Sequence, residues 1–93
     1  MTFTELDPKD PDSEVFYSWD FALWLGEGET ISNYTFPDFP AELTNISDAE
    51  ALGVVTMKIG DGVAGTSYDC TCRIVTSAGQ TEDKTFTLPV LET

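Results

Sequence analysis

The sequence predicts an all-β fold, an antiparallel β-sandwich of six to seven strands, and two patterns lead to this prediction. Short segments alternate apolar with polar residues, which is the period of a strand that buries one face. Clusters of glycine, proline, aspartate and asparagine separate these segments at short intervals, a spacing typical of sandwiches and not of helical folds. The length of 93 residues fits one domain with a single core.

The chain is expected to begin with a polar arm over residues 1–14, followed by a single sandwich domain over residues 15–93. Pro8 and Pro11 favour extended or turn conformations in this arm, because proline restricts the residue before it. The carboxylates of Asp10 and Asp12 are candidate contacts with a partner protein.

Aromatic and β-branched residues predict two strands in the first half of the domain, over residues 15–21 and 30–36. A turn that contains two glycines separates them. In the first strand the alternation places three aromatic side chains on the inward face, and we assign Trp19 to the core; the three are Tyr17, Trp19 and Phe21.

Residues 37–53 have the weakest pattern in the chain. We expect a short strand near residues 42–46 and a turn or single helical turn over residues 47–51. Alternation returns at residues 54–59 and predicts a strand there, with Val55, Met57 and Ile59 on its inward face.

The last third of the chain predicts a closing β-hairpin. Its first strand places Tyr68, Cys70, Cys72 and Ile74 on one face, and its second strand places Phe86, Leu88 and Val90 on one face. Between the strands, Gly79 supplies the positive φ that a short hairpin loop needs. The burial in one hairpin does not offset the entropy of ordering its backbone, so it must pack on a second sheet. We expect that sheet to contain the segments near Tyr17 and Ile31.

The position of Tyr68, two residues before Cys70, matches the tyrosine corner of sandwich domains. In that corner the hydroxyl bonds to backbone a few residues upstream, which here points to Asp61 and Gly62; a plain core tyrosine is the alternative. Together with the closing hairpin, this predicts an immunoglobulin-like or fibronectin type III-like sandwich, with Tyr68 and Gly79 as its structural markers.

Cys70 and Cys72 are expected to be free, buried thiols that fill the core. Residues two apart on one strand lie roughly 6.5 to 7 Å apart at Cα, and their parallel side chains do not point at each other. A metal site needs more ligands than these two, and the chain contains no histidine. No metal and no cofactor is therefore expected.

The charge is extreme for a small domain, with 17 acidic against 4 basic residues and a formal net charge of −13. Nucleic acid and anionic membranes are poor partners for such a surface. The apolar runs are too short to span a bilayer, and the N-terminus does not have the pattern of a signal peptide. We therefore expect a soluble protein made in a cytoplasm.

Catalysis is not expected, because the usual nucleophilic triads require histidine. A carboxylate pair would need a cleft that a domain of this size rarely provides. Calcium ligands could come from Asp7, Asp10 and Asp12, but their spacing does not match a calcium loop with its glycine and distal glutamate. A stand-alone module that binds carbohydrate or calcium is kept as an alternative.

Three aromatic residues fall outside the regular alternation and lie near turns, where aromatic side chains often anchor interfaces. For Trp24 core packing is the favoured interpretation, and for Phe39 burial is the alternative to partner contact. These candidate interface residues are Trp24, Phe36 and Phe39.

Five short motifs stand out at the two ends of the chain: Lys9-Asp10-Pro11-Asp12, residues 17–25, residues 28–31, Gly65-Thr66-Ser67-Tyr68 and residues 77–81. Together they resemble the motifs of small tailed-phage virion proteins called fibre-tail adaptors, while residues 37–53 have no counterpart. The resemblance implies a non-enzymatic, immunoglobulin-like structural protein of the virion, made in the bacterial cytoplasm. It also implies many copies or a homo-oligomer, bound to larger tail, fibre or capsid proteins. A capsid decoration protein on the phage head is the alternative.

Overall fold

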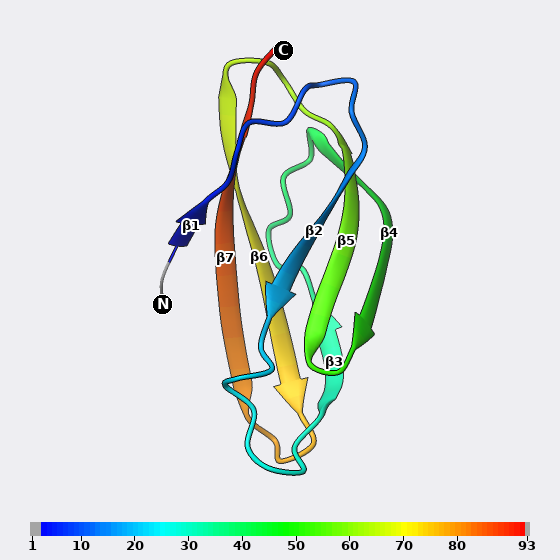
Figure 1. Cartoon of the computed structure of the whole chain (residues 1–93), viewed down its shortest axis with the longest axis vertical. Helices are drawn as coiled ribbons and strands as arrows, with labels where there is room; N and C mark the ends of the chain where they lie inside the picture. The colour runs from blue at the N-terminus through cyan, green and yellow to red at the C-terminus, as the bar shows by residue number, and fades with distance from the viewer. Residues whose placement is uncertain (1–2, 93) are drawn as a thin grey trace.

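The computed structural model describes residues 3–92, with side chains from Leu6 onward, and this part of the chain is all-β (Figure 1). The strands are β1 (Phe3–Glu5), β2 (Val15–Asp20), β3 (Ile31–Thr35), β4 (Leu43–Ala51), β5 (Val54–Asp61), β6 (Thr66–Thr76) and β7 (Thr81–Val90). The described residues include no helix long and apolar enough to cross a membrane. The predicted all-β class is confirmed.

The strands form two packed sheets, one in the order β1-β7-β6-β3 and one in the order β2-β5-β4. Every pairing is antiparallel except that of β1 with β7. Immunoglobulin domains place their second, fifth and fourth strands in one sheet and their third, sixth and seventh in the other. The same grouping is present here, so the sandwich is immunoglobulin-like.

The core lies between the two sheets and consists of the residues that alternation points inward. Val55, Met57 and Ile59 of β5 are fully buried, as are Cys70, Cys72 and Ile74 of β6. Trp19 of β2 stacks on Phe86 of β7 with ring centroids 4.7 Å apart, and its Nε1 donates to the backbone oxygen of Cys70 at 3.1 Å. Trp19 therefore joins the sheets by packing and by a hydrogen bond.

One expectation about the sheets is wrong. The segment at Ile31 forms β3, which pairs with β6 and so belongs to the sheet of the closing hairpin. The sheet opposite the hairpin contains β2, β5 and β4. Alternation identifies a strand with one buried face, but it does not identify the strand's neighbours.

The turn or helical turn expected over residues 47–51 is also wrong, because β4 continues through Ala51. These residues are small or charged and mostly exposed, since β4 is an edge strand with β5 as its one neighbour. Pairing with β5 down to Ala51 opposite Val54 keeps the backbone extended. A bulge between Asn45 and Ser47 further obscures the alternation.

The segment before β2 is attached to the sandwich. β1 pairs with β7, and the backbone nitrogens of Leu6 and Lys9 donate to Thr87 and Pro89 at 3.0 and 2.9 Å. The Lys9 side chain is buried and its Nζ donates to the backbone oxygen of Asp61 at 2.7 Å. A separate unit over residues 1–14 remains a prediction, but the segment from Phe3 to Lys9 lies along β7.

The closing hairpin has the predicted turn. Gly79 has a φ of 84°, and the Thr76 nitrogen donates to the Gln80 oxygen at 2.8 Å. A β-carbon at Gly79 would meet nothing within 4 Å, so the positive φ and not lack of space favours glycine there.

Tyr68 makes an upstream backbone bond of the predicted kind, with Val63 as its partner and not Asp61 or Gly62. Its hydroxyl accepts from the Val63 nitrogen at 2.9 Å and donates to Glu42 Oε1 at 2.7 Å. The side chain is 6% exposed. The hydroxyl thus ties the loop between β5 and β6 to the loop before β4.

Replacing Tyr68 with phenylalanine should lower the free energy of unfolding by about 1 to 3 kcal/mol, because a partly buried backbone donor loses its partner. Tyr34→Phe is the matched control, since the Tyr34 hydroxyl bonds to Asp48 at an exposed site. Denaturant unfolding should show a clearly smaller loss for the control. Equal losses would contradict a special role for the corner.

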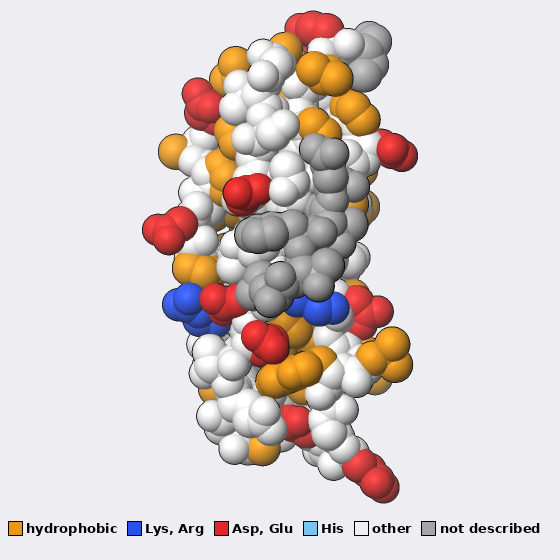
Figure 2. All heavy atoms as spheres, turned by 90° about the vertical axis from the view of Figure 1, so that its left-hand side faces the viewer, with side chains coloured by type: hydrophobic (Ala, Val, Ile, Leu, Met, Phe, Trp, Pro, Cys, Tyr) orange, Lys and Arg blue, Asp and Glu red, His pale blue; other side chains and the backbone are white. Residues whose placement is uncertain are grey.

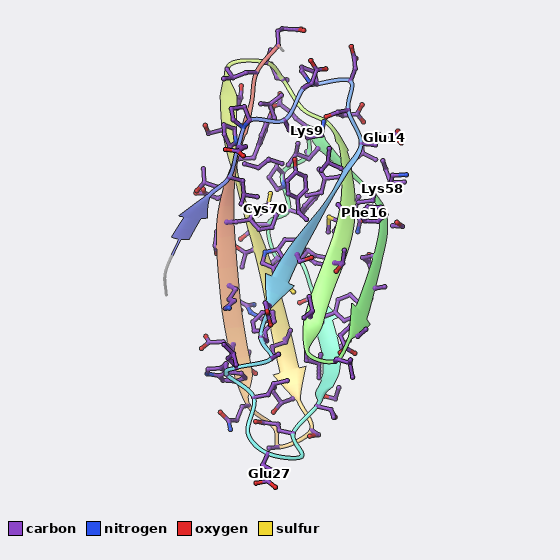
Figure 3. The ribbon with its side chains drawn as sticks, viewed as in Figure 1. Lys9, Glu14, Phe16, Glu27, Lys58 and Cys70 are labelled. Atoms are coloured by element: carbon purple, nitrogen blue, oxygen red, sulfur yellow. The ribbon has the colours of Figure 1, made fainter. Side chains whose placement is uncertain are left out.

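Cys70 and Cys72 are free, and both are fully buried (Figure 3). Burial raises the pKa of both thiols to about 12, with a further contribution from Asp69 at Cys70 and from Asp83 and Asp48 at Cys72. Since the thiolate is the reactive species, both should be inert in the folded protein.

A thiol reagent at pH 8 should therefore label neither cysteine in the folded protein and both after unfolding. Stability should also fall as pH rises from about 9 towards about 12, because the unfolded chain releases the thiol protons first. A variant with alanine at both positions should lose this part of the pH slope. Rapid labelling of the native protein would refute the assignment.

Candidate interaction surfaces

The acidic turn at Asp10 and Asp12 is held by its own hydrogen bonds. Asp10 Oδ1 accepts from the Asp12 nitrogen at 2.8 Å, and the Asp10 backbone oxygen accepts from the Ser13 nitrogen at 3.1 Å. Asp12 is exposed, while Asp10 is half-buried. Among the described residues no group of three or more His, Cys, Asp or Glu side chains could hold a metal ion.

Phe36 and Phe39 extend the core and are half-buried. The Phe36 ring lies 5.3 Å from the Trp19 ring and 6.4 Å from the Phe39 ring, measured between centroids. Tyr34 adds an edge contact to Phe36 at 5.8 Å. These two candidates therefore lie together and present one side to the solvent.

Trp24 lies in the loop after β2 and is 38% exposed. It lines a groove of about 470 Å³, together with Trp19 and Asp20 of β2, Phe86 of β7 and Leu6. The loop is fixed because the Trp24 nitrogen donates to the Phe21 oxygen at 3.0 Å. The Nζ of Lys84 donates to the Asp20 backbone oxygen, which joins β7 to the end of β2.

The structure does not bring all five candidates together. The loop that contains Trp24 is at the lower end of the molecule in Figure 1, where Figure 3 labels Glu27. The acidic turn follows Lys9, which Figure 3 labels at the upper end. Phe36 and Phe39 pack on the core cluster between the sheets.

Two exposed leucines near the lower end were not among the predicted interface residues. Leu23 is 101% exposed and Leu52 is 94% exposed. Leu52 and Gly53 form the turn between β4 and β5, with φ values of 52° and 85°. A left-handed conformation is rare for leucine, and turns of this shape favour asparagine followed by glycine.

Phe16 and Ile46 were also missed, with exposed fractions of 64% and 42%. Phe16 could have been found, because the alternation that points Trp19 inward points Phe16 outward. Ile46 could not, since it lies in the bulge of β4.

The outer face of the four-stranded sheet is occupied by its own side-chain pairs. Arg73 Nε donates to Asp83 Oδ1 at 2.8 Å, and the hydroxyls of Thr71 and Thr85 lie 2.7 Å apart. The Asp83 carboxylate raises the pKa of the Arg73 guanidinium by hydrogen bonding and by charge, so the guanidinium stays charged. Figure 2 shows carboxylates along the whole height of the side that carries β1 and β7.

Fold and surface together define a small immunoglobulin-like sandwich with buried thiols and exposed apolar side chains, which is the class of a small structural module. The family model for Podophage GP4 fiber-tail adaptor protein gp77 matches residues 9–89, and the chain belongs to that family. No curated protein matches the chain. The protein is thus a phage fibre-tail adaptor, a structural protein of the tail.

Leu52→Asn should raise the free energy of unfolding by about 1 kcal/mol, because asparagine tolerates the left-handed conformation better. For a domain of this size that is about 4 to 8 °C in thermal midpoint. Leu23→Asn is the control, as Leu23 is equally exposed but its φ is not positive, and its midpoint should not change. A lower midpoint for Leu52→Asn would show that the leucine stabilises the fold.

Proposed function

We propose that this protein joins fibre to tail without catalysing a reaction, and that it does so in several copies per particle. The observation that carries this proposal is the family match over residues 9–89, which includes every strand from β2 to β6 and nearly all of β7. After synthesis in the host cytoplasm, the folded module would be added to the particle during assembly.

The shape of the protein supports a bridging role. Its extents are 43 × 24 × 19 Å, so surfaces near opposite ends can contact different proteins. The loop after β2 and the turn between β4 and β5 lie toward the lower end in Figure 1, and they contain the exposed Leu23 and Leu52. Phe16, by contrast, lies in the upper half of the molecule beside β5, away from that end (Figure 3).

The charge supports a partner of opposite sign. At −13 the chain repels free copies of itself, whereas a basic surface on the tail or fibre attracts it. Copies would then be arranged by their larger partners and not by contacts with one another. In this proposal Trp24 belongs to one contact, and Phe39, Phe36, Asp10 and Asp12 remain candidates for others.

Imaging of purified particles at moderate resolution should show density for this protein where fibres meet the tail. Particles that lack the protein should lose that density and their fibres, while their heads keep the same lattice. Density on the head lattice would overturn the adaptor proposal in favour of capsid decoration. Particles without the protein that keep all their fibres would also contradict it.

A further inference from the structure

The outer face of the β2-β5-β4 sheet points away from the core and is here called the open face. Since Val55, Met57 and Ile59 point inward, the residues between them on β5 point outward, together with the residues paired to them. Phe16 lies opposite Lys58, and Thr56 lies between Ser18 and Ala49. With Ile46 added, the open face is defined by Phe16, Ser18, Ile46, Ala49, Thr56 and Lys58.

The open face is poor in carboxylates, although the chain carries 17 acidic residues. Two carboxylates of β4 are held by other partners: Asp48 accepts from the Tyr34 hydroxyl at 2.7 Å, and Glu50 accepts from the Gly53 nitrogen at 3.0 Å. Two acidic side chains lie beside the face. Glu14 comes just before β2, and Asp20 is its last residue. The open face thus carries Lys58 as the one charged side chain among its defining residues, and acidic side chains lie at its ends.

Two exposed apolar side chains lie on this face. Phe16 is 64% exposed, and the Lys58 Nζ lies 5.6 Å from the centre of its ring. The bulge of β4 places Ile46 over Gly60, where a β-carbon would come within 3.0 Å of Ile46 Cδ1. Lys58 also lies 3.9 Å from Glu14, and Figure 3 shows these two residues and Phe16 near one another beside β5.

The two outer faces of the sandwich differ in how many of their side chains bond to one another. On the four-stranded sheet, directly opposed residues bond to each other: Arg73 to Asp83, Thr71 to Thr85, and Thr87 to Asp69 at 2.8 Å. The open face has one such side-chain bond between its defining residues, between the hydroxyls of Ser18 and Thr56 at 3.1 Å. Its apolar side chains, Phe16 and Ile46, remain exposed to solvent.

We propose that the open face docks onto another virion protein whose surface is apolar at the centre and basic at the rim. This inference rests on the proposed adaptor function. The apolar centre would cover Phe16 and Ile46, and the basic rim would meet Glu14 and Asp20. A second copy of this chain does not fit, because both copies carry −13 and the same acidic ends.

The size of the open face supports docking in several copies. Three strands about 4.8 Å apart and roughly 25 Å long cover roughly 350 Å². Stable pairs of proteins bury about 800 Å² on each partner. One copy therefore binds weakly, and several copies held on one particle gain affinity through multivalency.

The test uses purified tails from particles that lack this protein, to which tagged protein is added and the bound amount is measured. Phe16→Ser and Ile46→Ser should each weaken binding at least tenfold. Leu91→Ser is the matched control, since Leu91 is 45% exposed and lies outside the open face. Thermal midpoints within a few degrees of wild type show that the variants fold.

The outcomes separate the two proposals. If the wild type does not bind these tails, the adaptor function fails; if the wild type and both variants bind equally, only the open face fails. Binding by wild type and Leu91→Ser, lost in both variants and weakened by sodium chloride, supports docking to a basic rim. Sedimentation that shows wild-type dimers, absent in Phe16→Ser, would overturn the proposal in favour of self-association.

Discussion

The packing of Trp19 between the two sheets is the contact on which the rest of the structure depends. Immunoglobulin domains commonly join their second and sixth strands by a disulfide, with the second cysteine two residues after the corner tyrosine. Here Cys70 takes that position on β6, but β2 offers Trp19, which bonds to the Cys70 backbone and stacks on Phe86. Aromatic packing with one hydrogen bond thus replaces the covalent link, and it does not depend on an oxidising compartment.

With the large side chains turned inward, the two outer faces determine what the protein can bind. On the outer face of the four-stranded sheet, polar side chains bond to one another, and Arg73 and Asp83 form the charged pair. The open face keeps Phe16 and Ile46 exposed, with Lys58 as the charged side chain among its defining residues. A structural adaptor needs stable contacts and no reaction, so this difference between the faces fits the family to which the chain belongs.

Much of the fold could be predicted from the sequence, because alternation depends only on which side of a strand is buried. It correctly assigned the inward residues of β5, β6 and β7. It failed at Ser47–Ala51, where an edge strand with exposed side chains has no buried face to signal it. It also could not place β3, since the choice of sheet depends on contacts between distant segments. The candidate site was harder still: Leu52 and Ile46 are exposed through a turn and a bulge, which leave no periodic signal.

Hydroxyl-radical footprinting of free and tail-bound protein tests the central claim most directly, because it reports the solvent exposure of individual side chains. Phe16 and Ile46 should be oxidised in the free protein and protected at least severalfold in assembled tails, while Leu91 stays equally reactive in both. Phe16 that remains fully reactive in assembled tails would contradict the account, because the open face would then face solvent in the virion.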